Sequence, residues 1–149
     1  MSGTEELTAS FASVFLRLTR LLDKRMAREG ASLARTRVLL MIQRRGPVKA
    51  IDIAELFGLA PRTVTDTLDG MERQGLIRRE PDPKDRRAKR ILITPAGQQA
   101  VAATEPLRRE LTGQVIGSLS AEERETFARI LGKLEAAVAA QEECRPPAG

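Results

Sequence analysis

The residues best suited to chemistry form one cationic segment in the middle of the chain. Positions 84–90 read KDRRAKR, which gives a net charge of +4 over seven residues. The whole 149-residue chain carries 25 Lys and Arg against 20 Asp and Glu, a net charge of +5. Concentrated positive charge attracts polyanions, so this segment is a candidate contact for nucleic-acid phosphates. Its basic side chains are Lys84, Arg86, Arg87, Lys89 and Arg90.

Several other kinds of chemistry are excluded by what the sequence lacks. There is no His, and Cys144 is the only cysteine. A zinc or iron site built on imidazole and a Ser-His-Asp triad are therefore impossible, and so are an internal disulfide and a CxxC pair. The carboxylates show no spacing that pairs a nucleophile with a base. We therefore expect a protein that is not an enzyme and that holds no cofactor and no metal.

The elements that must position the cationic segment are mostly helices. Apolar residues recur every three or four positions in several stretches, and each stretch is bounded by a capping residue, Pro or Gly. Gly70 lies inside one predicted helix, where it costs about 1 kcal/mol relative to Ala. The predicted helices cover about 5–28, 32–45, 49–57 and 61–74, followed by one that begins at Thr94-Pro95 and one that begins with the capping box Ser120–Glu123.

A β-hairpin is predicted between the fourth and fifth helices. Residues 76–79 read LIRR and begin one strand, residues 91–93 read ILI and form a second, and the Pro/Asp cluster at 81–85 between them forms a turn. The cationic segment therefore lies at the tip of the hairpin. A short helix, a tight turn with Gly58 and a second helix precede it, which is the order of a helix-turn-helix. We expect a mainly α fold with a small β-hairpin wing, that is, an α+β winged helix-turn-helix.

The two ends of the chain carry long apolar stripes that a domain this small cannot cover by itself. Packing within one chain is the alternative, but a helical dimer interface buries both stripes. A twofold dimer also presents two recognition helices to DNA half-sites about 34–36 Å apart. We expect residues 1–30 to form a dimerisation helix, 31–95 the winged domain, 96–143 C-terminal dimerisation helices, and 144–149 a flexible tail. The predicted interface residues are Leu7, Phe11, Val14, Leu18, Leu111, Val115, Phe127, Leu131, Leu134 and Val138.

Nearly the whole chain resembles the MarR family of regulators. The resemblance is carried by Ile53–Leu56, Pro61–Thr65, Leu68–Ile77, Asp82–Arg87 and Ile91–Gly97. It implies a homodimer that binds a pseudo-palindromic operator in double-stranded DNA. In the wing, it implies that Asp85 and Arg87 set the loop's shape while an Arg near the tip enters the minor groove. It also implies repression that a small aromatic or anionic ligand relieves.

The candidate DNA-binding residues lie in the 61–74 helix and in the wing. An Arg in the first helical turn can contact guanine or phosphate, and Thr hydroxyls can reach phosphate or base edges, although helix capping and ordinary surface hydroxyls are equally good explanations for the Thr residues. Asp66 departs from the basic residue that related sequences often carry, and a solvated carboxylate is the simpler explanation for it. The candidates are Arg62, Thr63, Thr65, Asp66, Thr67, Arg73, Lys84, Arg86, Arg87 and Lys89.

Three further points stay open at the level of sequence. The alternative function is a winged-helix protein-interaction module without direct DNA binding, because the 61–74 helix mixes acidic and basic residues. A ligand pocket, if present, is expected near Phe11, Phe15, Arg17, Arg35 and Arg37, but no single residue is assigned to it. The N-terminus lacks the features of a signal peptide and the longest apolar run is Val38–Ile42, so we expect a cytoplasmic protein without membrane contact.

Overall fold

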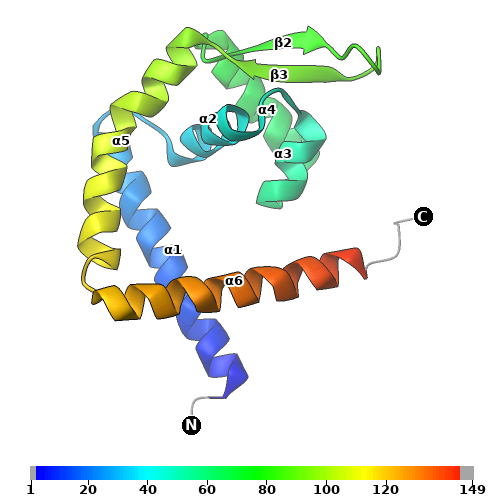
Figure 1. The fold of residues 1–149 in the computed structure, drawn as a ribbon. Coiled ribbons are helices and arrows are strands. Elements are labelled where there is room, and N and C mark those ends of the chain that lie inside the picture. The colour runs from blue at the N-terminus through cyan, green and yellow to red at the C-terminus, as the bar shows by residue number, and fades with distance from the viewer. Residues whose placement is uncertain (1–2, 145–149) are drawn as a thin grey trace. The chain divides into compact units, whose positions relative to one another are not determined.

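Six helices and three short strands are present in residues 3–144, the part of the chain that the computed structural model describes (Figure 1). The predicted tail lies outside these residues, apart from Cys144. In chain order, the elements are α1 (Thr4–Arg28), α2 (Leu33–Arg45), β1 (Val48–Lys49), α3 (Ala50–Phe57), α4 (Pro61–Arg73), β2 (Ile77–Pro81), β3 (Lys89–Ile93), α5 (Pro95–Ile116) and α6 (Ala121–Glu143).

The chain divides into two units, one up to Arg108 and one from Arg109 onward. The first unit holds α1 to β3 and the first part of α5, and the second holds the end of α5 and α6. The predicted winged helix-turn-helix, with its mainly helical content and its hairpin, is confirmed within the first unit.

Local sequence signals account for the ends of the helices around the helix-turn-helix. The Ser32 hydroxyl caps α2 by accepting from the backbone N–H of Arg35, and Gly46 follows its last residue. Gly58 ends α3 in the left-handed conformation, with φ of 62°, which a side chain would oppose. Pro61 starts α4 at a position where a missing N–H breaks no bond.

The strands form one antiparallel sheet with the order β1-β3-β2. β2 and β3 pair from Ile77 opposite Ile93 to Pro81 opposite Lys89, so the predicted hairpin is confirmed. Pro81 is tolerated because β2 is an edge strand. The third strand, β1, was not predicted: Val48 pairs with Ile91 on the far side of β3, in a stretch that the sequence assigns to a loop and a helix start.

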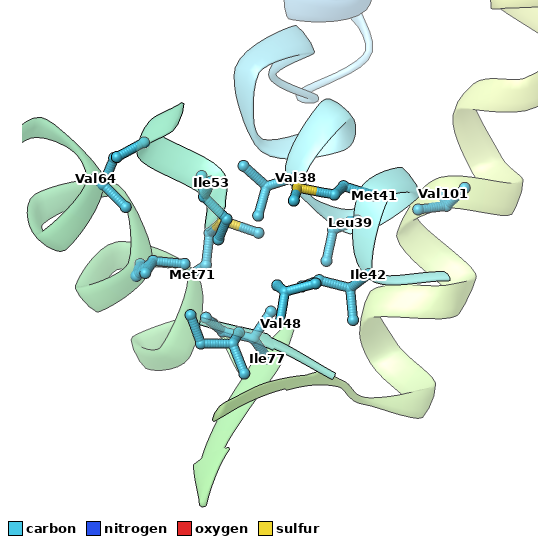
Figure 2. Close-up of a cluster of buried hydrophobic side chains, with 13 residues drawn as sticks. Val38, Leu39, Met41, Ile42, Val48, Ile53, Val64, Met71, Ile77 and Val101 are labelled. Atoms are coloured by element: carbon cyan, nitrogen blue, oxygen red, sulfur yellow. The ribbon is translucent and has the colours of Figure 1, made fainter. Parts of the chain in front are cut away.

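Apolar side chains from α2, α3, α4, α5 and the three strands meet in one core (Figure 2). Val38 and Leu39 of α2 face Ile53 of α3 and Met71 of α4, while Ile77 closes the core from the sheet. The core therefore fixes α4 against α2 and α3 on one side and joins it to the wing on the other. The buried cluster is completed by Met41, Ile42, Val48, Ala54, Val64, Leu68, Ile91 and Val101.

The start of α5 is locked to the end of α4 by a short set of bonds. The Thr94 hydroxyl accepts from the Gly97 N–H, as an N-cap does, and donates to the Gly75 carbonyl at 2.5 Å. The Thr94 N–H also donates to the Leu76 carbonyl at 3.1 Å. The turn after α4, the wing's second strand and α5 thus share one junction.

Gly97 at this junction is expected to tolerate no side chain. A Cβ there would overlap the Leu76 carbonyl oxygen and lie 2.7 Å from Ile93 Cγ1. We expect Gly97→Ala to destabilise the protein by about 2–3 kcal/mol, because the added methyl group would collide with a backbone carbonyl, which cannot move aside as a flexible side chain can. Urea denaturation measures this. The matched control is Gly113→Ala in the same helix, where a Cβ meets nothing within 4 Å and helix propensity favours Ala. Equal stability of the two variants would contradict the expectation.

Candidate nucleic-acid interface

Helix α4 presents a charged outer face because its apolar residues turn inward. Val64, Leu68 and Met71 are at most 2% exposed and belong to the core. Residues spaced by four and seven positions share a face of a helix, so Arg62, Asp66 and Arg73 form one outward row. All three are exposed. An α-helix fits the major groove of DNA, and the two guanidinium groups of this row can donate hydrogen bonds to base edges there.

The threonines of α4 are exposed or half-buried, and two of them bond back to their own helix. The Thr65 hydroxyl donates to the Pro61 carbonyl at 3.0 Å, and that of Thr67 donates to the Thr63 carbonyl at 2.8 Å. Both oxygens keep lone pairs that accept from a ligand. Thr63 does not cap the helix, because the N-cap residue is Ala60.

Two of the three carboxylates on α4 are held by an arginine of the wing. Arg79 on β2 places Nη2 2.8 Å from an Asp69 carboxylate oxygen and Nη1 3.3 Å from one of Glu72. Sequence reasoning missed this contact, because residues ten positions apart are joined only once the hairpin folds back on the helix. Asp66 alone of the three carboxylates faces outward without an ion pair in residues 3–144.

The tip of the wing is a structured loop over residues 82–88. The Asp82 N–H donates to the Ala88 carbonyl at 3.0 Å and closes the loop. Inside it, the Asp85 carboxylate accepts from the backbone N–H of Arg87 at 3.0 Å. Asp85 therefore shapes the loop through the main chain of Arg87, and the Arg87 guanidinium stays available.

Four wing cations are exposed and have no ion pair within residues 3–144: Lys84, Arg86, Arg87 and Lys89. The fifth, Arg90, differs because its Nη2 lies 3.2 Å from a Glu80 carboxylate oxygen. Lys49 also has a local partner, since its Nζ lies 3.3 Å from Asp82. Arg44 and Arg45 end α2, where basic residues complement the helix dipole. The wing tip thus holds four cations within positions 84–89 that have no ion pair in the described residues.

Asp82 makes the base of this loop sensitive to acid. The hydrogen bond that the Lys84 N–H donates to the Asp82 carboxylate lowers the pKa of Asp82 below its ordinary value of 3.8, burial works against this shift, and Lys49 adds to the lowering. A carboxyl with a lowered folded-state pKa stabilises the fold above its unfolded pKa, and loses this effect as the pH falls through the folded value. We expect Asp82→Asn to lower stability at pH 7 and to match the wild type once the pH lies below the folded-state pKa of Asp82. Urea denaturation across this range measures the difference, and a difference independent of pH would contradict the assignment.

The predicted interface residues fall into two groups. Leu7, Phe11 and Val14 on α1 are more than half exposed, and Leu18 is half-buried. In the second unit, three residues of α6 are exposed: Leu131, Leu134 and Val138. Phe127 and Val115 are half-buried. Leu111 is buried within the single chain, with 2% of its surface exposed. The single chain therefore leaves the α1 and α6 stripes largely uncovered, while Leu111 has little surface left for a partner.

A small cavity of about 160 Å³ lies inside the winged region. Two polar residues line it, Arg37 and Thr67, and Phe15 of α1 sits beside Arg37, with the guanidinium carbon 5.9 Å from the ring centre. Of the other residues expected near a pocket, Arg35 lies instead against α4. The apolar lining comes from α2, α3, the turn and α4: Ala34, Val38, Ile53, Phe57, Leu59, Val64 and Leu68.

Two further observations concern residues 3–144 only. None of the helices there combines the length and the hydropathy needed to cross a membrane. No three His, Cys, Asp or Glu side chains of this part gather in a way that could hold a metal ion.

A helix-turn-helix core, a charged hairpin and a packed junction define the chain as a winged-helix protein. Residues 32–89 match the MarR family. A crystal structure of MarR is 26% identical, with a TM-score of 0.78, and the match covers 91% of this chain and 93% of that one. Residues 32–89 are therefore similar to the MarR family, and the chain shares the winged helix-turn-helix fold of the solved MarR structure.

Two further solved structures are similar over most of their length. The MepR–DNA complex of S. aureus is 25% identical, with a TM-score of 0.73 and coverage of 87% of this chain and 96% of that one. BpsR of Bordetella bronchiseptica, whose DNA binding is regulated by 6-hydroxynicotinic acid, is 20% identical, with a TM-score of 0.75 and coverage of 87% and 98%. The second likeness concerns the fold alone.

Proposed function

We propose that this protein is a homodimeric transcription regulator that binds a pseudo-palindromic operator in double-stranded DNA. The observation that carries the proposal is the group of four exposed cations, without an ion pair in the described part of the chain, on the wing that follows the helix-turn-helix. Phosphate contacts by Lys and Arg supply much of the affinity of such proteins. MepR, which shares the fold over most of the chain, has been solved with DNA.

The proposed contacts divide between base reading and positioning. Arg62 lies in the first turn of α4 and faces outward, so it contacts guanine or phosphate. Arg73, in the last turn, contacts phosphate. Thr63, Thr65 and Thr67 contribute hydroxyls, and Asp66 accepts from a cytosine amino group or stays solvated. In the wing, Arg86 or Arg87 enters the minor groove, with Lys84 and Lys89 on phosphates.

Dimerisation follows from the uncovered stripes on α1 and α6. Exposed apolar faces of this extent mark sites of association. A twofold dimer holds two α4 helices about one turn of DNA apart, at about 34–36 Å. A single winged domain would contact one half-site only. The second copy therefore supplies both affinity and the symmetry that a palindromic site requires.

We also propose that the regulator is a repressor whose DNA binding is relieved by a small aromatic or anionic ligand. The cavity of about 160 Å³ supports this, because cavities of about 150 Å³ accept one benzene ring. Arg37 at its wall offers a guanidinium to a carboxylate. Val64, Thr67 and Leu68 of α4 form another wall, so an occupant would act directly on the reading helix. BpsR, a protein of this fold, is regulated by an aromatic acid.

The test is selection of binding duplexes from a random pool by the purified chain, followed by mobility shift across a salt series. We expect a palindromic consensus and a steep log–log salt slope, near −7 if about eight phosphates are neutralised. The alternative, a protein-interaction module, predicts no selected duplex and no binding even at low salt. Its support in the acidic residues of α4 is weakened by the pairing of Asp69 and Glu72 with Arg79.

A further inference from the structure

Two acidic residues of α4, the helix proposed to read base edges, are held by an arginine of the wing. Asp69 and Glu72 lie one turn apart on α4, with their side chains 47% and 45% exposed. Arg79 reaches both from β2 with its two terminal nitrogens, and its own side chain is only 20% exposed. One guanidinium thus ties two successive turns of α4 to the first strand of the wing.

The opposite flank of α4 is held by a second arginine. Arg35 of α2 donates from Nη1 to the Gln74 side-chain oxygen, and its Nη2 lies 3.1 Å from where a Cβ of Gly70 would be. Gly70 therefore has a packing role, because the missing side chain makes room for the Arg35 guanidinium. Since Gly70 and Gln74 lie on the other side of the outward row from Asp69 and Glu72, the two arginines hold α4 from both flanks.

These contacts have a consequence for reading DNA. Base readout depends on side chains held in register with the groove, and the outward row of α4 is set by how the helix is rotated about its axis. The wing carries the phosphate contacts, so a bond between β2 and α4 fixes the two contact surfaces relative to each other. The same bond also neutralises the negative charge of Asp69 and Glu72, which would otherwise repel the DNA phosphates.

We propose that Arg79 is a positioning residue for sequence discrimination: by binding Asp69 and Glu72 it locks the reading helix to the wing. The inference rests on the proposed function. Arg79 does not itself contact DNA, because both terminal nitrogens are engaged and the side chain is mostly buried. Its removal therefore affects the preference for the operator more than general attraction to DNA.

The experiment compares two ways of breaking the same contact that change the charge in opposite directions. Arg79→Ala removes a positive charge, and the double variant Asp69→Asn with Glu72→Gln removes two negative charges. For each, binding is measured to a duplex that the wild type selects from a random pool, and to a scrambled duplex of the same length. We expect the ratio of the two affinities to fall by about tenfold in both variants. A triple variant that combines all three substitutions is expected to lower this ratio no further, because the three residues act through one contact.

The matched control is Arg78→Ala, the neighbouring arginine of the same strand, which pairs with Glu80 instead. It makes the same change in charge, and we expect it to leave the ratio unaltered. Circular dichroism checks folding, and if Arg79→Ala is unfolded, the double variant decides alone. An unchanged ratio in the double variant, or equal effects of Arg78→Ala and Arg79→Ala, overturns the inference while wild-type binding stands. A wild type that selects no duplex overturns the proposed function itself.

Discussion

Replacing Arg86 and Arg87 together with alanine is expected to weaken binding to the selected duplex by at least about tenfold while the dimer stays intact. Both side chains are exposed at the wing tip and have no ion pair in residues 3–144. A dimer loses four cations in this variant. Because each lost phosphate contact lowers the salt slope by about 1, we expect the slope to fall by up to about 4. Fluorescence anisotropy across a salt series measures both effects.

A matched control for this variant is the double replacement of Arg44 and Arg45 with alanine. It removes the same charge from an exposed pair at the end of α2, outside the loop at 82–88. We expect it to reduce affinity only slightly, through the general field of the protein. If the two double variants lose affinity equally, the net charge rather than the wing determines binding, and the wing has no specific role.

Introducing a carboxylate at Leu131 is expected to dissociate the dimer. Leu131 lies on the same face of α6 as Phe127, Leu134 and Val138, and this face is apolar and partly exposed in the single chain. A carboxylate buried between two such faces without a partner costs several kcal/mol. We expect Leu131→Asp to sediment as a monomer at micromolar concentration and to lose operator binding.

The control for Leu131→Asp places the same carboxylate on the opposite face of the same helix. Ala136 lies about half a turn of projection away from the apolar row and is exposed. Ala136→Asp is expected to remain a dimer with unchanged DNA binding. Circular dichroism separates dissociation from unfolding. A Leu131→Asp chain that stays dimeric and binds normally would remove α6 from the interface.

Much of the fold could be predicted because its signals are local. Ser32, Gly58, Pro61 and the Ser120–Glu123 pair act on their own helix ends, and the structure has a helix end at each of them. β1 could not be predicted, because a strand of two residues is too short to show the alternation of apolar and polar residues that marks a strand. It exists only because Val48 meets Ile91, more than forty positions away in sequence.

The candidate site divides in the same way. The exposed cations of the wing follow from composition and from the turn residues around them. The arginines that hold α4 do not, since Arg79 meets Asp69 and Arg35 meets Gln74 only through tertiary packing. From the sequence, Gly70 only lowers the stability of its helix. The structure explains its presence, because a side chain there would crowd the Arg35 guanidinium.

Analytical ultracentrifugation of the purified chain, alone and with the selected duplex, measures directly whether two copies bind DNA together. We expect a species of about 33 kDa at micromolar concentration, twice the chain mass of 16.4 kDa, and one such dimer on each duplex. A folded 16.4 kDa monomer that binds the duplex one copy at a time would contradict it.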